Sequence, residues 1–201
     1  MTDNYEKIAG SNLERLYQNL PADLADRLPA RREGDTFTFQ AFGETCTISP
    51  QGIELGAGGH PSVMHLLISL YALHAGREQA VLEPFQSYRD FADSGPYRQA
   101  FTAHTEQILV PKVDTIREFS ETIKEKLSGT AAPAADAGDF SFVLWPLPKI
   151  ALCYIFYEAD EEFPASVTCL FSANARTFLP VDALADTGEY TSRKILEILT
   201  E

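Results

Sequence analysis

The chain has 201 residues, of which 45% are hydrophobic and 22% are charged, and this length suits one domain or two small ones. Sixteen Lys and Arg residues against 29 Asp and Glu residues give a formal net charge of −13. A nucleic acid or an anionic membrane surface would repel such a chain, so we expect neither as a partner. The longest unbroken apolar run, Ile150 to Tyr157, is far shorter than the ~20 residues that a bilayer-spanning helix needs.

The N-terminal residues and the cysteines bear on the cellular compartment in which the protein is expected. The first residues contain neither the basic nor the apolar stretch of a secretion signal. The cysteines, Cys46, Cys153 and Cys169, are an odd number at distant positions, which argues against a disulfide framework and favours a reducing compartment. We therefore predict a cytoplasmic protein, and the sequence does not indicate its oligomeric state.

The first quarter of the chain predicts two helices and then a small antiparallel meander. Apolar residues from Tyr5 to Leu20 recur at helical spacing, and Pro21 fits the start of a second, short helix. The strict alternation of Thr36–Ala41 predicts a strand with Phe37, Phe39 and Ala41 facing a core. The predicted segments are helices over 5–20 and 21–29, and strands over 36–41, 46–48 and 53–55.

The middle of the chain predicts helices. A Gly-rich loop over 56–61 nearly matches a dinucleotide-binding pattern, but Pro61 stands at the third Gly position, so we interpret it as a loop entering a helix. That helix is predicted over 61–75 and is apolar over a wide arc. Segment 85–91 is ambiguous, and two further helices are predicted over 96–109 and 111–127.

The last third returns to strands. Residues 128–138 include no hydrophobe larger than Ala and are predicted to form a mobile internal linker. Strands follow over 140–145, 150–158 and 166–171, the second of them central and covered on both faces. A helical turn near 182–185 and a last amphipathic helix complete an α+β fold, an antiparallel sheet of hairpins with helices packed on it, in a single domain over 1–201.

Four carboxylates gather in the turn from Glu158 to Glu162. Such spacing suits a hard cation, but the calcium-loop template fails because Phe163 stands where it requires Gly. The alternative is that charges at a hairpin tip keep the strand edge in solution. The histidines and cysteines lack ligand spacing as well, so we expect no metal site and no cofactor.

A second polar turn, 172–176, follows the last predicted strand. Its Ser and Asn side chains could hold a ligand or bond their own backbone. We predict that the hairpin brings this turn beside the acidic turn and that the two form one pocket. The predicted binding residues are Asp160, Glu161, Glu162, Phe163, Ser172, Asn174, Arg176 and Arg89.

Several short motifs of the last third resemble one family. They are Leu147-Pro148-Lys149-Ile150, Asp160-Glu161-Glu162-Phe163-Pro164, Leu170-Phe171-Ser172 and Phe178-Leu179-Pro180. They are similar to the pattern of a domain of unknown function found widely in anaerobic bacteria and archaea. The sequence departs from that pattern at Ala159, where the family has Gly, and at Ser172, where it has Asp.

The resemblance brings little information on function, because the family is uncharacterised. Some members of that family carry an iron–sulfur module similar to one in corrinoid proteins, and this chain contains no such cysteine spacing. Because the sequence indicates a large apolar core and contains no complete catalytic set, we expect a non-enzymatic binding or accessory domain for a redox or corrinoid enzyme of an anaerobe, with a protein or a small molecule as partner. One alternative is a hydrolase or lyase that uses Asp160, Glu161 or Glu162 in the acidic turn as base or metal ligand, with Arg89 or Arg176 orienting an anion. Another is a subunit that serves only to dock a partner.

Overall fold

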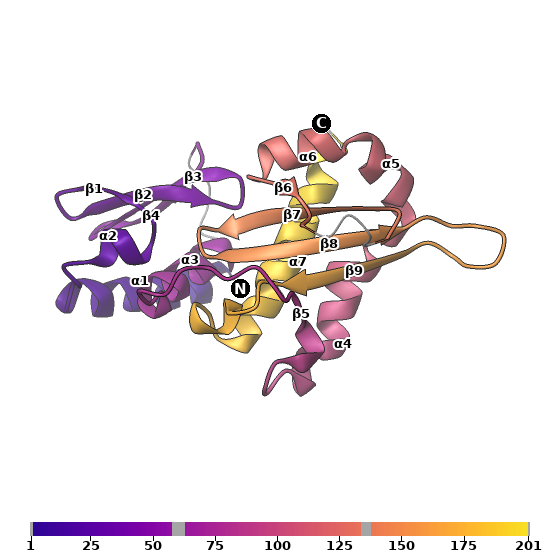
Figure 1. Cartoon of the computed structure of the whole chain (residues 1–201). Coiled ribbons are helices and arrows are strands. Elements are labelled where there is room, and N and C mark those ends of the chain that lie inside the picture. The colour runs from indigo at the N-terminus through magenta and orange to yellow at the C-terminus, as the bar shows by residue number, and fades with distance from the viewer. Residues whose placement is uncertain (1, 58–62, 134–137, 201) are drawn as a thin grey trace.

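The computed structural model describes residues 2–57, 63–133 and 138–200, and it confirms an α+β fold with antiparallel sheets (Figure 1). The strands form a four-stranded sheet of order β1-β2-β3-β4 and a five-stranded sheet of order β5-β9-β8-β7-β6. The strands are β1 (Arg31–Glu33), β2 (Thr36–Ala41), β3 (Glu44–Ser49), β4 (Gly52–Leu55), β5 (Gln86–Ser87), β6 (Thr130–Ala131), β7 (Phe140–Leu147), β8 (Ile150–Tyr157) and β9 (Ser166–Phe171).

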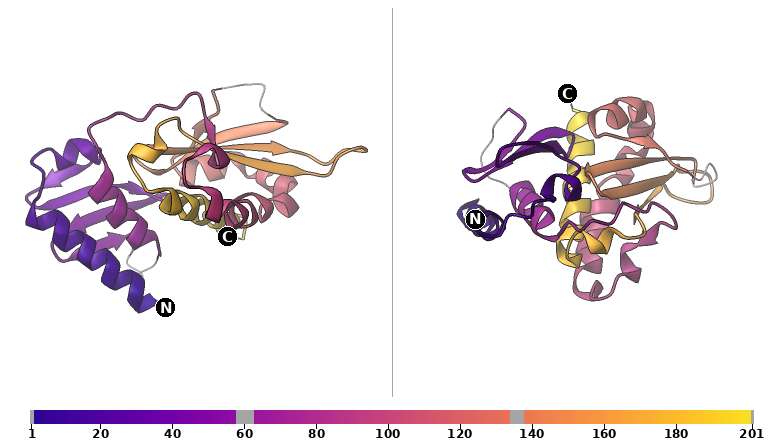
Figure 2. Two further views of the ribbon diagram at one scale, coloured as in Figure 1. Left: turned by 90° about the horizontal axis from the view of Figure 1, so that it is seen from below. Right: turned by 60° about the vertical axis from the view of Figure 1, so that its left-hand side comes forward.

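The helices pack on one face of each sheet, as the two further views show (Figure 2). The long ones are α1 (Thr2–Gln18), α3 (Val63–His74) and α7 (Val181–Ile198). The shorter ones are α2 (Leu24–Arg27), α4 (Arg98–Phe101), α5 (Val113–Glu118) and α6 (Ser120–Lys126), together with the π-helical segment η3 (Thr102–Gln107) and the 3-10 turns η1 (Tyr88–Asp90), η2 (Gly95–Tyr97), η4 (Val110–Lys112) and η5 (Ala175–Thr177). No helix in the described parts of the chain is both long and apolar enough to cross a bilayer.

The four-stranded sheet is the predicted meander with one strand added. Phe37, Phe39 and Ala41 of β2 are buried, as their alternation predicted. The added strand β1 is wholly exposed along its three residues, so hydrophobic periodicity could not reveal it. The β2–β3 turn consists of Phe42 and Gly43, both with positive φ, which suits a two-residue hairpin. Phe42 is buried and its N–H donates to Pro146 O at 2.7 Å, which fixes this hairpin to the other sheet.

The five-stranded sheet has two unlike faces. The inner face, with Phe142, Tyr154 and Phe171, packs against the helices and joins a hydrophobic cluster that also includes the core of the four-stranded sheet. The outer face carries Val143, Ala151 and Cys153, against which the segment after α3 packs with Leu82 and Phe85. β8 is the central strand, as predicted. The single domain expected over 1–201 stays a prediction, and the continuous cluster supports it.

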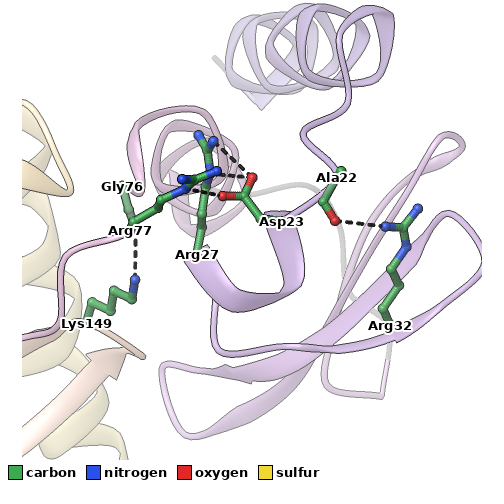
Figure 3. A network of polar contacts seen from close by, with 7 residues as sticks. All are labelled: Ala22, Asp23, Arg27, Arg32, Gly76, Arg77 and Lys149. Atoms are coloured by element: carbon green, nitrogen blue, oxygen red, sulfur yellow. Dashed lines mark hydrogen bonds and ion pairs between the residues drawn. The ribbon is translucent and has the colours of Figure 1, made fainter.

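Polar contacts close the junction between the two sheets (Figure 3). Asp23 at the start of α2 accepts hydrogen bonds from Arg27 Nε at 3.0 Å and Arg77 Nε at 2.5 Å, which lower the pKa of its carboxyl to about 2. Lys149, in the β7–β8 turn, is buried and donates to Gly76 O at 2.9 Å, just after the C-terminus of α3. A cation at a helix C-terminus is favoured by the helix dipole, so this lysine ties the sheet to α3.

Four sequence-based predictions differ from the structure. The helix predicted over 111–127 is interrupted at Phe119, between α5 and α6. The linker over 128–138 contains β6, which pairs with Phe142 and Val143 of β7, while residues 134–137 lie outside the described residues. The helical turn near 182–185 and the last helix are one helix, α7, because the small residues between them pack closely against other helices: a Cβ on Gly188 would lie 2.7 Å from Phe101. The helix predicted over 96–109 contains a π-helical segment. Part of the Gly-rich loop, residues 58–61, lies outside the described residues.

Candidate functional site: a pocket with two arginines and a partly buried carboxylate

The two predicted turns lie at opposite ends of the β8–β9 hairpin. The hairpin itself is confirmed, with Tyr157 opposite Ser166 at the acidic end and Leu152 opposite Phe171 at the other. The acidic turn joins the strands, whereas residues 172–176 follow the far end of β9, six residues away along the strand. The prediction that the two turns form one pocket is therefore wrong: a hairpin places its connecting turn and its outgoing chain at opposite ends.

The acidic turn projects into solvent (Figure 1). Asp160, Glu161, Glu162 and Phe163 are all exposed, Phe163 by 67%. Asp160 Oδ1 accepts hydrogen bonds from the N–H groups of Glu162 at 2.8 Å and Phe163 at 2.7 Å, and these bonds lower the pKa of its carboxyl. Asp160 thus shapes the turn through its own side chain, as in an Asx turn.

The second turn uses its polar side chains to hold neighbouring backbone. Buried Ser172 accepts at Oγ from Ala151 N–H at 3.3 Å. Asn174 accepts at Oδ1 from Val81 N–H and donates from Nδ2 to Gln79 O, both at 2.8 Å. These side chains therefore fasten the segment that crosses the outer face of the sheet. Arg176 is exposed beside them.

Arg89, the last predicted residue, lies apart from both turns and lines a pocket of about 250 Å³. The pocket lies between η1, the helix that continues from α4 into η3, and the edge of β9. Its lining combines two guanidinium groups, a carboxylate and several hydroxyls over an aromatic floor. The lining residues are Ser87, Tyr88, Arg89, Arg98, Phe101, Thr102, Glu106 and Thr168.

The floor of this pocket is built by stacked rings. Tyr88 stacks on Phe101 with ring centroids 4.4 Å apart, and both rings contact Phe171 of β9. Tyr88 also donates from its hydroxyl to Val181 O at 2.9 Å, which holds η1 against the start of α7. Ser87 Oγ accepts from Arg89 N–H at 3.4 Å and caps η1. The position of Arg89 is thus set by rigid neighbours on both sides.

Arg98 is held next to Arg89 by neutral acceptors. Its Nη2 donates to Arg89 O at 2.6 Å, and its Nε donates to Ser94 Oγ at 3.0 Å. Within the described part of the chain, neither arginine has a carboxylate within 4.0 Å, although the whole sequence carries a net charge of −13. Arg89 and Arg98 thus line one pocket without forming an ion pair, although the charge of Arg89 acts on the nearby Glu106 carboxyl, and two guanidinium groups in one pocket favour an anion.

Glu106 supplies a partly buried carboxylate to the lining of the pocket. Burial raises the pKa of its carboxyl, against the opposing effects of a hydrogen bond from Cys169 N–H, a hydrogen bond from Thr102 and the charge of Arg89. Glu106 Oε1 accepts from Cys169 N–H at 3.0 Å and thereby covers one donor of the β9 edge. A carboxylate with a raised pKa near a cation is typical of functional sites.

The π-helical segment directs Glu106 toward the sheet. Such segments are rare in proteins, and those that occur often lie at functional sites, because the extra residue in the turn displaces backbone groups. Here Thr105 O accepts a hydrogen bond from Ser192 Oγ of α7 at 2.8 Å, and Ser192 in turn contacts the buried Tyr154 hydroxyl at 2.9 Å. The helix behind the groove is therefore anchored to both α7 and the sheet.

Sequence reasoning missed Arg98, Glu106 and Thr168. A signal for the first two existed, since Arg98, Thr102 and Glu106 recur at spacings of four and so share one face of a predicted helix. Nothing in the sequence linked that face to Thr168, because only tertiary packing brings the edge of β9 to the helix.

The comparisons with known proteins identify a family without a known activity. Residues 21–194 match the family described as a domain of unknown function, DUF3786, and this range includes every residue of the groove. The chain therefore belongs to that family. No curated protein matches the chain, and no solved structure matches it.

Proposed function

We propose that the protein is a cytoplasmic, non-enzymatic binding domain that holds an anionic ligand in the groove lined by Arg89, Arg98 and Glu106. The observation that supports this most directly is that Arg89 and Arg98 line one pocket and that neither forms an ion pair within the described residues of a strongly acidic chain. A carboxylate or phosphate group would satisfy both arginines with charge-assisted hydrogen bonds. Glu106 would accept a hydrogen bond from a donor on the same ligand.

The accessory role beside a redox or corrinoid enzyme of an anaerobe is part of this proposal, and the family resemblance supports it. The cysteines of this chain are buried free thiols: Cys153 faces the outer side of the sheet, opposite Leu170, and Cys169 faces the inner side, opposite Tyr154. Burial raises the pKa of the Cys153 thiol to about 11 and of the Cys46 thiol to about 12, which makes them poor nucleophiles and ligands. The partner would therefore carry the redox centre.

A hydrolase or lyase is the second candidate function. Asp160, Glu161 and Glu162, which were predicted to supply its base, are exposed at the hairpin tip and do not line the pocket. The observation that favours catalysis is instead Glu106, whose raised pKa suits a general acid or base beside Arg89. Saturable turnover of small esters or phosphate esters that disappears in Glu106→Gln would establish this alternative.

Calorimetric titration with acetate, succinate and inorganic phosphate tests the binding proposal. We expect saturable binding of at least one anion and a loss of about 10-fold to 100-fold in affinity in Arg89→Gln, the fold-change for a hydrogen bond to a charged group. Arg176→Gln is the matched control, because Arg176 is an exposed arginine outside the pocket. If no anion binds, or if both variants lose affinity equally, the proposal is wrong.

A further inference from the structure

The strand that borders the arginine pocket has an open edge. β5 pairs with β9 only at Leu170 and Phe171, and in the part of the chain that the structure describes no strand pairs with the outward side of residues 166–169. Cys169 N–H points outward, since it donates to Glu106 Oε1. N–H and C=O groups of alternate residues in an antiparallel strand point to the same edge, so the backbone groups of Val167 also face outward.

A groove runs along this open edge. A second pocket, of about 450 Å³, shares Thr102 and Glu106 with the arginine pocket and continues from it toward the hairpin tip. One wall is the helix with its extension into η4, and the other wall is the edge of β9. The residues that this second pocket adds are Gln107, Val110, Pro111, Ala165, Ser166 and Val167.

We propose that this groove binds an extended peptide segment of a partner protein that ends in a free carboxylate. The terminal carboxylate would lie between Arg89 and Arg98, and the preceding residues would pair with Val167 as an added strand. The occupant follows from charge and shape together: a paired cation at one end, an unpaired strand edge along one side and an apolar wall with Val110 opposite. The inference deepens the proposed function and rests on it.

The dimensions set the length and direction of the peptide. The distance from Ala165 to Thr168 along β9 corresponds to about 10 Å, at ~3.3 Å per residue, which accommodates three to four residues. The arginine pocket reaches Thr168 and the second pocket reaches Ala165, so a peptide with its C-terminus at the arginines runs parallel to β9. In a parallel pair, the N–H and C=O groups of one residue bond to two residues of the partner strand, so Val167 alone provides both bonds.

Glu106 defines where the added strand ends. Its carboxylate already occupies Cys169 N–H, so no incoming backbone can pair beyond Thr168. The peptide must therefore stop next to the arginines, where a terminal carboxylate replaces the next peptide group. If the carboxylate belonged instead to a side chain of the peptide, the peptide backbone would have to continue beyond it, where Glu106 and β5 occupy the strand edge.

NMR titration of the isotope-labelled full chain tests this inference. The probe is an N-acetylated tetrapeptide library randomised at all positions, in three forms: free C-terminal acid, C-terminal amide, and free acid with N-methylated backbone amides. We expect the free acid to shift the amide signals of Val167 and Thr168, and we expect about 10-fold weaker binding for each of the other two forms. The altered libraries test the contacts without changing the protein fold.

A variant and simple anions complete the test. Val167→Pro removes the outward N–H at an edge position, where proline is tolerated, and should weaken peptide binding while acetate still binds. If acetate or phosphate binds but no peptide binds more tightly and Val167 does not shift, the peptide inference is wrong and the anion site stands. If acid and amide libraries bind equally, the carboxylate anchor fails and the peptide inference with it, whereas the proposed function fails if no simple anion binds.

Discussion

The acidic turn and the arginine groove lie along the same strand, β9, and differ in how their charges are satisfied. At the tip, Asp160, Glu161 and Glu162 are consecutive in the sequence and exposed to water, and Asp160 accepts the hydrogen bonds of the turn. In the groove, Arg89, Arg98, Glu106 and Thr168 come from three separate segments, since Arg98 and Glu106 share one helix, and they meet beside the stacked rings of Tyr88 and Phe101. A charge cluster that is conspicuous in the sequence is thus a solvated surface, while the groups that share a pocket are dispersed along the chain.

The largest expected difference between the two regions is in stability. Phe171→Ala should lower the free energy of unfolding by about 3–5 kcal/mol, because Phe171 is fully buried and contacts Tyr88, Phe91 and Phe101 beneath the groove. Phe163→Ala, at the exposed tip, is the matched control and should leave stability almost unchanged. Urea unfolding of both variants measures this, and equal losses would contradict the assignment of the aromatic floor as core.

The second test concerns the hydrogen bond that closes the strand edge. Glu106→Ala removes the acceptor of Cys169 N–H and should cost about 1–3 kcal/mol, because that donor is left unsatisfied next to the core. Glu106→Gln keeps an acceptor oxygen without a charge and should retain most of the stability. If chemical denaturation shows no difference between the alanine and glutamine variants, the bond to Cys169 does not contribute to the fold.

The third test concerns Asp186 on α7, a partly buried carboxylate, in contrast to the exposed carboxylates at the tip. Burial, with Glu189 and Asp182 nearby, raises the pKa of Asp186 to about 6. The folded state then binds a proton more tightly than the unfolded state, so this group stabilises the fold at low pH and the contribution is lost as pH rises from about 4 to about 6. Asp186→Asn should flatten this dependence and stabilise the protein at pH 7 by on the order of 1 kcal/mol, after allowance for solvent screening.

Chemical denaturation between pH 4 and pH 7 measures the Asp186 effect. Asp160 should affect stability in the opposite direction. Backbone hydrogen bonds lower the pKa of its carboxyl, so its contribution to the free energy of unfolding is lost as pH falls. If Asp186→Asn is less stable than the parent protein at pH 7, or if its stability depends on pH as steeply as that of the parent, the Asp186 carboxyl is not shielded from water.

The smallest expected effect is at the tip. Glu161→Gln combined with Glu162→Gln should leave the melting temperature and the affinity for anions unchanged, because both side chains are exposed and lie at the end of the hairpin. Thermal unfolding and the calorimetric titration measure the two quantities. A loss of anion affinity in this variant would place a ligand contact at the tip and would remove the distinction between the two regions.

Much of the fold could be predicted from local patterns. The alternation of Thr36–Ala41 placed Phe37 and Phe39 in the core, and the apolar run from Ile150 identified the central strand, because both patterns follow from side chains that alternate between the faces of a strand. The short strands β1, β5 and β6 escaped prediction, since two or three residues show no period. Of the predicted binding residues, only Arg89 lies in the groove.

The sequence by itself determined the α+β class, the β8–β9 hairpin and the family to which residues 21–194 belong, because hydrophobic periodicity and local motifs are properties of neighbouring residues. Only the tertiary structure decided where the charges meet. The direction of β9 moved residues 172–176 away from the acidic turn, and the packing of η3 against the edge of β9 brought Glu106 to Cys169. Contacts between segments that are 63 residues apart depend on how helices and sheets pack, and no local pattern encodes them.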